Sequence, residues 1–441
     1  MSVQVGWIGL GAMGSGMASS LLSQGYPVKA YDVYTPSLEK AASLGAVRCD
    51  TPAAAAADVQ ILGLMVVNAE QVQDVLFGAG KVADVIQPHS SIIVFSTVPP
   101  SFLIKVRERL DALNKGIGLV DAPVSGGFIR AAEGQLSVMV SGTLASISTA
   151  RPVLDSLTRQ PNGNLAVVGD TVGQASDFKL INQVLCGIHI AVTSEAMALA
   201  ANLGCNPRKV YNALKDLSFM FGHRVPWQLQ DDGVPKSAMT IIYKDVGIVN
   251  DEARALRFPA PLSGVAEQLF TAALGAELAK EEDGNLIKLW VRFGGKSVVE
   301  SGTVKEEEEK AQASQGGDEV IKIISDLLNA VHTVSAAEAL AFARHKGMDL
   351  DEVFNIVGTS AATSKPLVTF KDELSWPNKF EPQSAQPTVA QILDDLANVM
   401  KEAKRVNTPL FLTQAAQQRF TEAALKGWSD KGSSIVGRLW L

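Results

Sequence analysis

One sequence pattern occurs twice in the second half of this 441-residue chain. The segment "KLINQVLCGIHI" begins at Lys179, and "KIISDLLNAVHT" begins at Lys322. The lysine, the apolar positions and the histidine fall at nearly the same places in both. The same spacing of 143 residues pairs His189 with His332, Glu195 with Glu338, and Gly204 with Gly347. Farther on, "IKLW" ending at Trp290 matches "GRLW" ending at Trp440. This self-similarity predicts a duplicated structural unit.

The duplicated unit is predicted to be helical. The stretch "ASDFKLINQVLCGIHIAVTSEAMALAANLG" from 175 to 204 contains no proline and ends on glycine, which predicts one unusually long helix. We therefore expect two tandem all-α domains, 169–290 and 318–441. Residues 291–317 between them contain the acidic run "KEEEEK" amid Gly and Ser, which predicts a flexible acidic linker.

The first 168 residues follow a different pattern, in which short apolar β-branched runs alternate with helical stretches. These runs include "VQVGWIGL", "PVKAYDV", "VQILGLMVV", "SIIVFST" and "GIGLVDAP". Such alternation is typical of a doubly wound, mostly parallel sheet. We therefore expect an α/β Rossmann domain over residues 1–168.

Composition narrows the classes of partner. The net charge of −7 argues against nucleic acid or an acidic membrane surface. Cys49, Cys186 and Cys205 have no CxxC spacing, which predicts reduced thiols in an intracellular protein. The histidines lack metal-ligand spacing, so no metal is expected. Because the chain enters a strand at once and no apolar run is judged long enough to span a bilayer, we expect a cytoplasmic protein with neither signal peptide nor membrane partner.

A glycine pattern follows the first predicted strand. In "GWIGLGAMGSG", Gly9, Gly11 and Gly14 form GxGxxG between that strand and a helix. Gly9 permits a tight turn, Gly11 lets a pyrophosphate approach the backbone, and Gly14 allows close packing of helix and strand. The helix N-terminus then faces the phosphates. The predicted dinucleotide contacts are Gly9, Leu10, Gly11, Ala12, Met13 and Gly14.

Asp32 ends the second predicted strand. A carboxylate there accepts hydrogen bonds from the adenosine ribose and repels a 2′-phosphate, which favours NAD over NADP. The alternative is an Asp that caps the turn "DVYTPS". The loops "MVVNAEQ" and "STVPP" follow further strands, and we expect the nicotinamide side of the cofactor to meet Val66, Val67, Asn68 and Thr97.

Two more segments carry candidate chemistry. In "DAPVSGG", the Ser125 hydroxyl and the backbone of Gly126 and Gly127 could cradle a carboxylate, although an ordinary glycine-rich turn has the same composition. On the long helix, Lys179, Asn182 and Gln183 share one face among apolar neighbours. A lysine there could move a proton to or from a substrate oxygen. The alternative to a catalytic Lys179 is a solvated lysine on the helix surface. The same alternative applies to Lys244 in "YKDVGI".

The segments "GLGAMGSGMA", "DAPVSGGFIRAAEGQLSVMVSG", "GQASDFKLINQ" and "YKDVGI" occur in the order found in the β-hydroxyacid dehydrogenase family. Residues 3–290 resemble that family. The resemblance implies that Lys179 is the catalytic acid/base and that Lys244 lies beside the nicotinamide. It also implies that the substrate is held by Ser125, Gly126, Gly127, Asn182 and Gln183.

Two departures from the family bear on the substrate. Asn182-Gln183 stands where the family usually has Asn-Asn, and Val66-Val67 where it often has Leu-Pro. Both variants resemble the branch that oxidises four-carbon sugar acids such as L-threonate. We therefore expect NAD-dependent oxidation of a small hydroxy acid. The alternatives are a 3-hydroxyisobutyrate or tartronate semialdehyde activity, imine reduction, which relatives of this fold perform but generally without the lysine, and a non-catalytic NAD-binding module.

The second copy lacks the polar pair of the first. Ser325 and Asp326 replace the two amides, and Asp394 stands where the first copy has Lys244. We therefore expect a degenerate, structural copy and not a second active site. Single-copy relatives pack this helical domain against a second subunit, and 6-phosphogluconate dehydrogenase carries a helical duplication. By that resemblance the second copy takes a dimer partner's place, giving a monomer or weak dimer.

Overall fold

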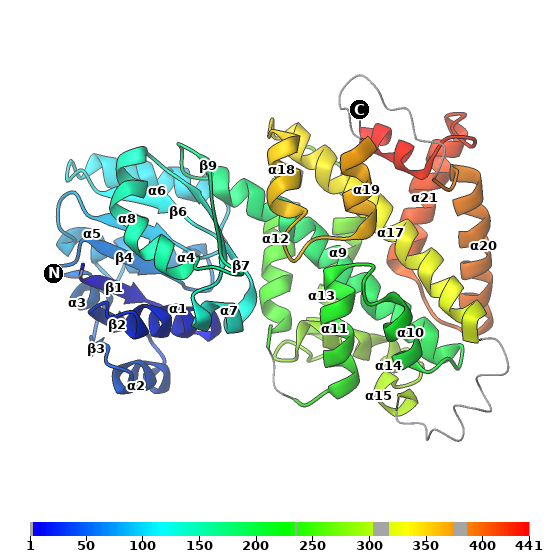
Figure 1. Ribbon diagram of the computed structural model, residues 1–441, viewed down its shortest axis with the longest axis horizontal. Helices are drawn as coiled ribbons and strands as arrows, with labels where there is room; N and C mark the ends of the chain where they lie inside the picture. Colours follow the sequence, from blue (N-terminus) through cyan, green and yellow to red (C-terminus); the bar gives the residue numbers. More distant parts are fainter. Residues whose placement is uncertain (1–2, 234–235, 303–316, 374–385, 441) are drawn as a thin grey trace. The chain divides into compact units, whose positions relative to one another are not determined.

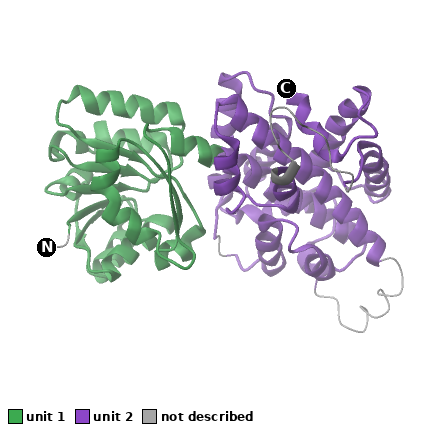
Figure 2. Cartoon of the chain, turned by 45° about the horizontal axis from the view of Figure 1, so that its top comes forward, with its two compact units in different colours: residues 1–180 green, residues 181–441 purple. Residues whose placement is uncertain are grey.

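Helix α9 (Gln174–Asn202) runs across the boundary between the two units of the chain, residues 1–180 and 181–441 (Figure 2). The computed structural model describes residues 3–233, 236–302, 317–373 and 386–440. Each unit is described by itself below. The element order confirms the expected Rossmann domain followed by a helical region.

Unit 1 is built around one twisted sheet with the strand order β3-β2-β1-β4-β5-β6-β8-β7, and β9 pairs with β8 (Figure 1). The strands from β3 to β6 run parallel, whereas β8 is antiparallel to β6 and β7. The strands are β1 (Val5–Ile8), β2 (Val28–Tyr31), β3 (Val47–Arg48), β4 (Ile61–Leu64), β5 (Ser91–Val94), β6 (Gly118–Asp121), β7 (Val124–Ser125), β8 (Ser137–Ser141) and β9 (Asn164–Gly169).

Helices cover both faces of this sheet, as its apolar strands require. The core on one face includes residues of α1, α2, α7 and α8, and the core on the other includes residues of α3, α4, α5 and α6. The bounds are α1 (Ala12–Ser23), α2 (Thr35–Ser43), α3 (Pro52–Ala56), α4 (Ala69–Phe77), α5 (Val82–Val85), α6 (Pro100–Ala112), α7 (Gly127–Glu133) and α8 (Leu144–Leu157).

Unit 2 consists of two sets of helices in the same order. The first copy continues from α9 through α10 (Pro207–Leu214), α11 (Phe219–Gln230), α12 (Met239–Ala255), α13 (Pro261–Gly275), η1 (Asp283–Ile287), α14 (Lys288–Arg292) and α15 (Val298–Ser301). The second copy comprises α17 (Gly317–His345), α18 (Leu350–Val357), α19 (Lys365–Glu373), α20 (Val389–Arg405), α21 (Phe411–Leu425) and η2 (Ser433–Trp440). Helix α13 packs against both α17 and α21 of the other copy.

Equivalent carboxylates of the two copies make reciprocal contacts. Glu195 of α9 accepts hydrogen bonds from the backbone N–H groups of Leu412 (2.6 Å) and Thr413 (3.2 Å) at the start of α21. Glu338 of α17 accepts the N–H groups of Leu262 and Ser263, both at 2.9 Å, at the start of α13. Each copy therefore satisfies helix-end donors of the other.

Other pairs of equivalent residues also make contacts between the two copies. The Trp290 indole donates to the Pro409 carbonyl at 2.7 Å, and the Trp440 indole donates to the Pro259 carbonyl at 2.8 Å. The imidazole rings of His189 and His332 meet with their centroids 4.2 Å apart. Burial lowers the pKa of both histidines, that of His332 to about 4, so both rings are neutral at pH 7. Each of these contacts from the first copy to the second thus has an equivalent contact from the second copy to the first.

The segment expected as a linker is partly helical. Helix α14 extends to Arg292, and α15 covers Val298–Ser301. The acidic run lies within 303–316, outside the described residues.

The expectation that no apolar run could span a bilayer was wrong. By length and composition alone, α9 and α17 are each long and apolar enough to span a bilayer. The most apolar 18-residue window is 100% buried in α9 and 67% buried in α17. Burial of this kind is typical of core helices, which are apolar on every side because protein surrounds them.

We predict that Glu195→Gln and Glu338→Gln each destabilise unit 2. The glutamine amide replaces one acceptor oxygen with NH₂, which leaves a buried backbone N–H without an acceptor at any pH. The expected loss is about 1–3 kcal/mol of unfolding free energy, measured by urea denaturation. Glu319→Gln, an exposed carboxylate on α17, is the matched control and should change it by less than about 0.5 kcal/mol. Equal effects at the three positions would contradict the role of the caps.

Candidate active site

The glycine loop lies at the point where the strand order of the sheet reverses, between β1 and β4, which is where doubly wound folds bind ligands. Gly9 has a φ of +98°, and a Cβ there would collide with the Met65 carbonyl. A Cβ on Gly14 would collide with the Gly9 carbonyl, whereas a Cβ on Gly11 would meet nothing within 4 Å. Packing therefore requires glycine at positions 9 and 14. Gly11 instead leaves open space at the start of α1, where Gly11 and Ala12 are exposed. Met13 is half-buried.

Asp32 caps the turn after β2, and the same carboxylate also contacts the glycine loop. Its Oδ1 accepts the N–H of Tyr34 at 2.7 Å, which caps the turn after β2. Its Oδ2 accepts the N–H of Leu10 at 2.5 Å, which fixes the carboxylate beside the glycine loop. A dinucleotide at this loop would meet a carboxylate on its adenosine side, where a 2′-phosphate is repelled.

The loops after β4 and β5 meet in unit 1. The N–H of Val66 donates to the Ser96 hydroxyl at 2.9 Å, which places Val66 beside the segment that contains Thr97. The N–H of Val67 donates to Gln71 Oε1 at 2.8 Å. Asn68 caps α4, since its Oδ1 accepts the N–H of Gln71 at 2.9 Å. One lone pair of that oxygen is therefore engaged in the cap, and the Asn68 NH₂ group points away from this bond as a further candidate contact.

The segment Ser125–Gly127 joins β7 to α7. Gly126 and Gly127 have φ values of +134° and +74°, which side-chain-bearing residues rarely adopt. Ser125 is buried, and a Cβ on Gly127 would meet nothing within 4 Å. The backbone is thus held in a form that only glycine adopts readily, with free space on one side, as a carboxylate cradle requires.

Asp121, which the sequence analysis did not single out, fixes the start of α9. The buried carboxylate accepts the Ser176 N–H (2.8 Å), the Ser176 hydroxyl (2.8 Å) and the Gly173 N–H (3.0 Å). Burial raises its pKa to about 6, against the lowering effect of these donors. Asp121 therefore positions the first turn of the helix that carries Lys179. Its place at the head of "DAPVSGG" was the signal available in the sequence.

The three polar residues on α9 are buried. Lys179 is 8% exposed, Asn182 1% and Gln183 6%. This burial contradicts the alternative of a solvated surface lysine. The spacings of three and four residues put the three side chains on one face of a continuous helix.

A carboxylate missed by the sequence analysis links the amides to Lys244. Gln183 Nε2 donates to Asp245 Oδ2 at 2.5 Å, and Lys244 Nζ forms an ion pair with Asp245 Oδ1 at 2.9 Å. Asn182 Nδ2 donates to Gln183 Oε1 at 3.1 Å. Unit 2 thus brings Asn182, Gln183 and Lys244 together through Asp245, which follows Lys244 in "YKDVGI".

The corresponding face of the second copy is arranged differently. Lys322, the counterpart of Lys179, has a side chain 64% exposed and contacts Asp326 at 2.6 Å and Asp395 at 3.0 Å. Hydrogen bonds to Asp326 and Asp395 raise the Lys322 pKa, which makes this lysine a poorer proton acceptor near neutral pH. A cavity of about 310 Å³ lies beside Asp326 and Asp395.

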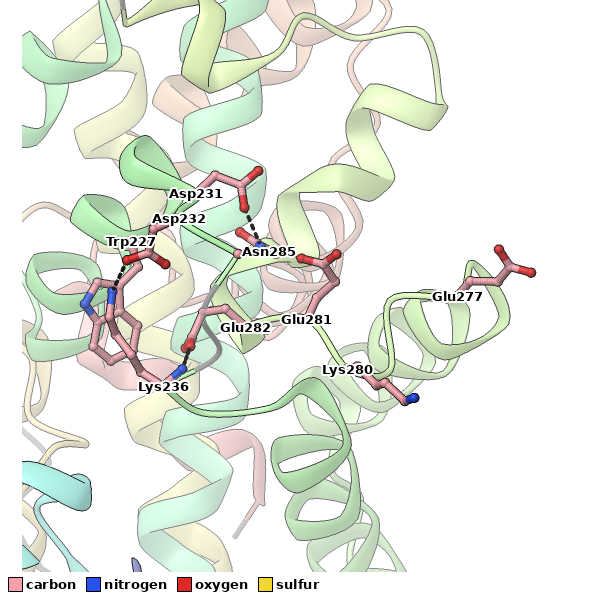
Figure 3. Close-up of a pocket in the computed structure, with 10 residues that line it drawn as sticks. Trp227, Asp231, Asp232, Lys236, Glu277, Lys280, Glu281, Glu282 and Asn285 are labelled. Atoms are coloured by element: carbon pink, nitrogen blue, oxygen red, sulfur yellow. Dashed lines mark hydrogen bonds and ion pairs between the residues drawn. The ribbon is translucent and has the colours of Figure 1, made fainter. Parts of the chain in front are cut away.

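A second cavity, of about 240 Å³, is lined by residues of the first copy (Figure 3). Burial and the neighbouring Asp283 raise the pKa of Glu282 in its wall to about 7. No predicted site residue is among the described residues that line it, which are Trp227, Asp231, Asp232, Gly233, Lys236, Glu277, Lys280, Glu281, Glu282 and Asn285.

Comparison with known families matches both units. Residues 4–169 match the model of the NAD-binding domain of 6-phosphogluconate dehydrogenase. Residues 173–290 and, separately, 316–440 match the model of the NAD-binding domain of NADP-dependent 3-hydroxyisobutyrate dehydrogenase. The chain belongs to this family of NAD-dependent hydroxyacid dehydrogenases. The two matches to one model confirm the duplication, and both models confirm a nicotinamide dinucleotide as the cofactor.

Relatives of this dehydrogenase include L-threonate dehydrogenases. The enzyme of Cupriavidus necator is 41% identical over 66% of this chain and 97% of its own length. That of Pectobacterium atrosepticum is 38% identical over 64% of this chain and 92% of its own. Each alignment covers nearly the whole relative with about two thirds of this chain.

Two solved structures are similar to different lengths of the dehydrogenase. A 3-hydroxyisobutyrate dehydrogenase from Salmonella typhimurium is 38% identical, with a TM-score of 0.61 over 65% of this chain and all of that chain. Plasmodium falciparum 6-phosphogluconate dehydrogenase matches 95% of this chain and 92% of its own with a TM-score of 0.63. At 15% identity the second likeness shows the fold alone, and that fold extends through both helical copies.

We predict that Asp32 sets the choice of cofactor. Replacing Asp32 with Ser and Val33 with Arg removes the carboxylate that repels a 2′-phosphate and adds a cation that attracts it. The ratio of kcat/KM for NAD to kcat/KM for NADP should fall by about 10- to 100-fold. A wild-type enzyme that already prefers NADP would contradict this assignment.

Proposed function

We propose that this dehydrogenase oxidises a four-carbon sugar acid of the L-threonate type and prefers NAD. Bound NAD supplies the hydride acceptor for the carbinol carbon. The observation that carries the proposal is the buried polar face of α9, where Lys179, Asn182 and Gln183 lie among apolar residues. The L-threonate dehydrogenases at 33–41% identity support the substrate class.

Lys179 takes the proton of the substrate hydroxyl as the carbonyl forms and returns one in the reverse reaction. Ser125, Gly126 and Gly127 hold the substrate carboxylate, which leaves the hydroxyl groups of the acid for the amides of Asn182 and Gln183. Gln183 is one methylene longer than the Asn usual in the family. This difference supports a pocket whose shape differs from that of 3-hydroxyisobutyrate dehydrogenases.

We also propose that the second helical copy takes the place of a partner subunit, so that the chain acts in the cytoplasm as a monomer or weak dimer. The reciprocal caps of Glu195 and Glu338 support this arrangement, because each copy satisfies buried donors of the other within one chain. The face of each copy that would otherwise need a partner is thereby occupied.

We predict that Lys179→Met lowers kcat by about 10²- to 10⁴-fold while NADH binding stays nearly intact, because a positioned acid/base is lost without loss of the cofactor loop. Steady-state rates with NAD and C3 to C5 hydroxy acids, L-threonate among them, measure the effect. Lys322→Ala, at the equivalent position of the second copy, is the matched control and should leave kcat unchanged.

Two results would count against this function. Residual activity of Lys179→Met within a few-fold of wild type would remove Lys179 as the acid/base. A wild-type enzyme that oxidises C3 acids much faster than L-threonate would overturn the substrate while leaving the reaction type intact.

A further inference from the structure

Ser360 of the second copy contacts Asn182 of the first, one of the two amides proposed above to bind the substrate. Its hydroxyl lies 2.8 Å from Asn182 Oδ1, and Ser360 and Asn182 are both buried. The hydroxyl is also 2.7 Å from the Val357 carbonyl, so its single hydrogen is shared between two acceptors. This contact joins residues 178 positions apart, which belong to different copies of the repeat.

The direction of the hydrogen bonds through this network is set by charge. Asp245 carries an ion pair with Lys244, and an ionised carboxylate can only accept hydrogen bonds. Gln183 must therefore turn its Nε2 toward Asp245 and its Oε1 toward Asn182. Asn182 in turn must direct its Nδ2 toward Gln183, which leaves its Oδ1 toward Ser360 and requires a donor there.

The loop that carries Ser360 is itself fixed against the first copy. The N–H of Phe219 donates to the Thr363 carbonyl at 3.0 Å, and the N–H of Lys365 donates to the Leu217 carbonyl at 2.9 Å. Within the loop, the N–H of Ala362 donates to the Ser360 hydroxyl at 3.1 Å. Because the hydroxyl is anchored on both sides, it can act as a fixed donor and not as a mobile side chain.

We propose that Ser360 is a positioning residue for the dehydrogenase reaction, supplied by the second helical copy. It holds Asn182, which holds Gln183, in the one orientation that leaves the second hydrogen of Gln183 Nε2 for a substrate oxygen. The inference rests on the proposed function, since it takes these amides as substrate ligands. The second copy then contributes to substrate recognition as well as to packing.

The test compares Ser360→Ala with Ser364→Ala. Ser364 is a second buried hydroxyl of the same region, 2% exposed against 9% for Ser360, where it accepts the N–H of Leu367 and has no part in the amide network. Ser360→Ala should raise KM for the hydroxy acid about 5- to 10-fold and leave KM for NAD unchanged. Ser364→Ala should leave both within two-fold, even where it lowers the melting temperature. Equal KM values for the two variants would overturn the proposal.

A second measurement tests the contact without turnover. Ser360→Ala and Asn182→Leu are combined in a double-mutant cycle read by melting temperature. Ser360→Ala leaves the buried Asn182 Oδ1 without this donor, and Asn182→Leu removes that oxygen. The double variant should therefore melt higher than the sum of the two single shifts implies. Additive shifts would overturn the contact. If no acid in the panel is oxidised, the proposed function fails, and this cycle then decides the contact on its own.

Discussion

The arrangement of unit 2 depends on two buried carboxylates that each copy of the repeat places against the other. Burying a carboxylate is costly unless hydrogen-bond donors replace the lost water. Glu195 and Glu338 find those donors at helix N-termini, where unpaired N–H groups and the helix dipole both favour negative charge. Burial still raises the pKa of each to about 7, so the donors offset only part of the cost.

The same helix that carries one of these carboxylates carries the candidate active site. Asp121 fixes the first turn of α9, and Glu195 ties its later turns to α21. Lys179, Asn182 and Gln183 lie between these two anchors. A helix held at both places can keep buried polar groups in one orientation, which a catalytic site requires. The second helical copy thus helps to hold α9, the helix that carries the candidate site.

Local sequence was enough to predict the cofactor loop, the polar face of α9 and the duplication. Gly9 and Asp32 are recognisable because strand, turn and helix follow one another directly in the chain. Asp245 and Ser360 were not identified, because their roles arise from contacts 62 and 178 residues away. The length of the apolar run in α9 was underestimated, since a core helix surrounded by protein is as apolar as a membrane span.

The claim that one copy replaces a partner subunit is tested most directly by sedimentation of residues 1–302 beside the full chain. The fragment ends after α15 and lacks both Glu338 and the α21 donors that Glu195 caps. If the second copy replaces a partner subunit, the full chain should sediment as a monomer or weak dimer, and the fragment should dimerise or aggregate through the face left uncovered. A fragment that remains a soluble, fully active monomer would contradict it.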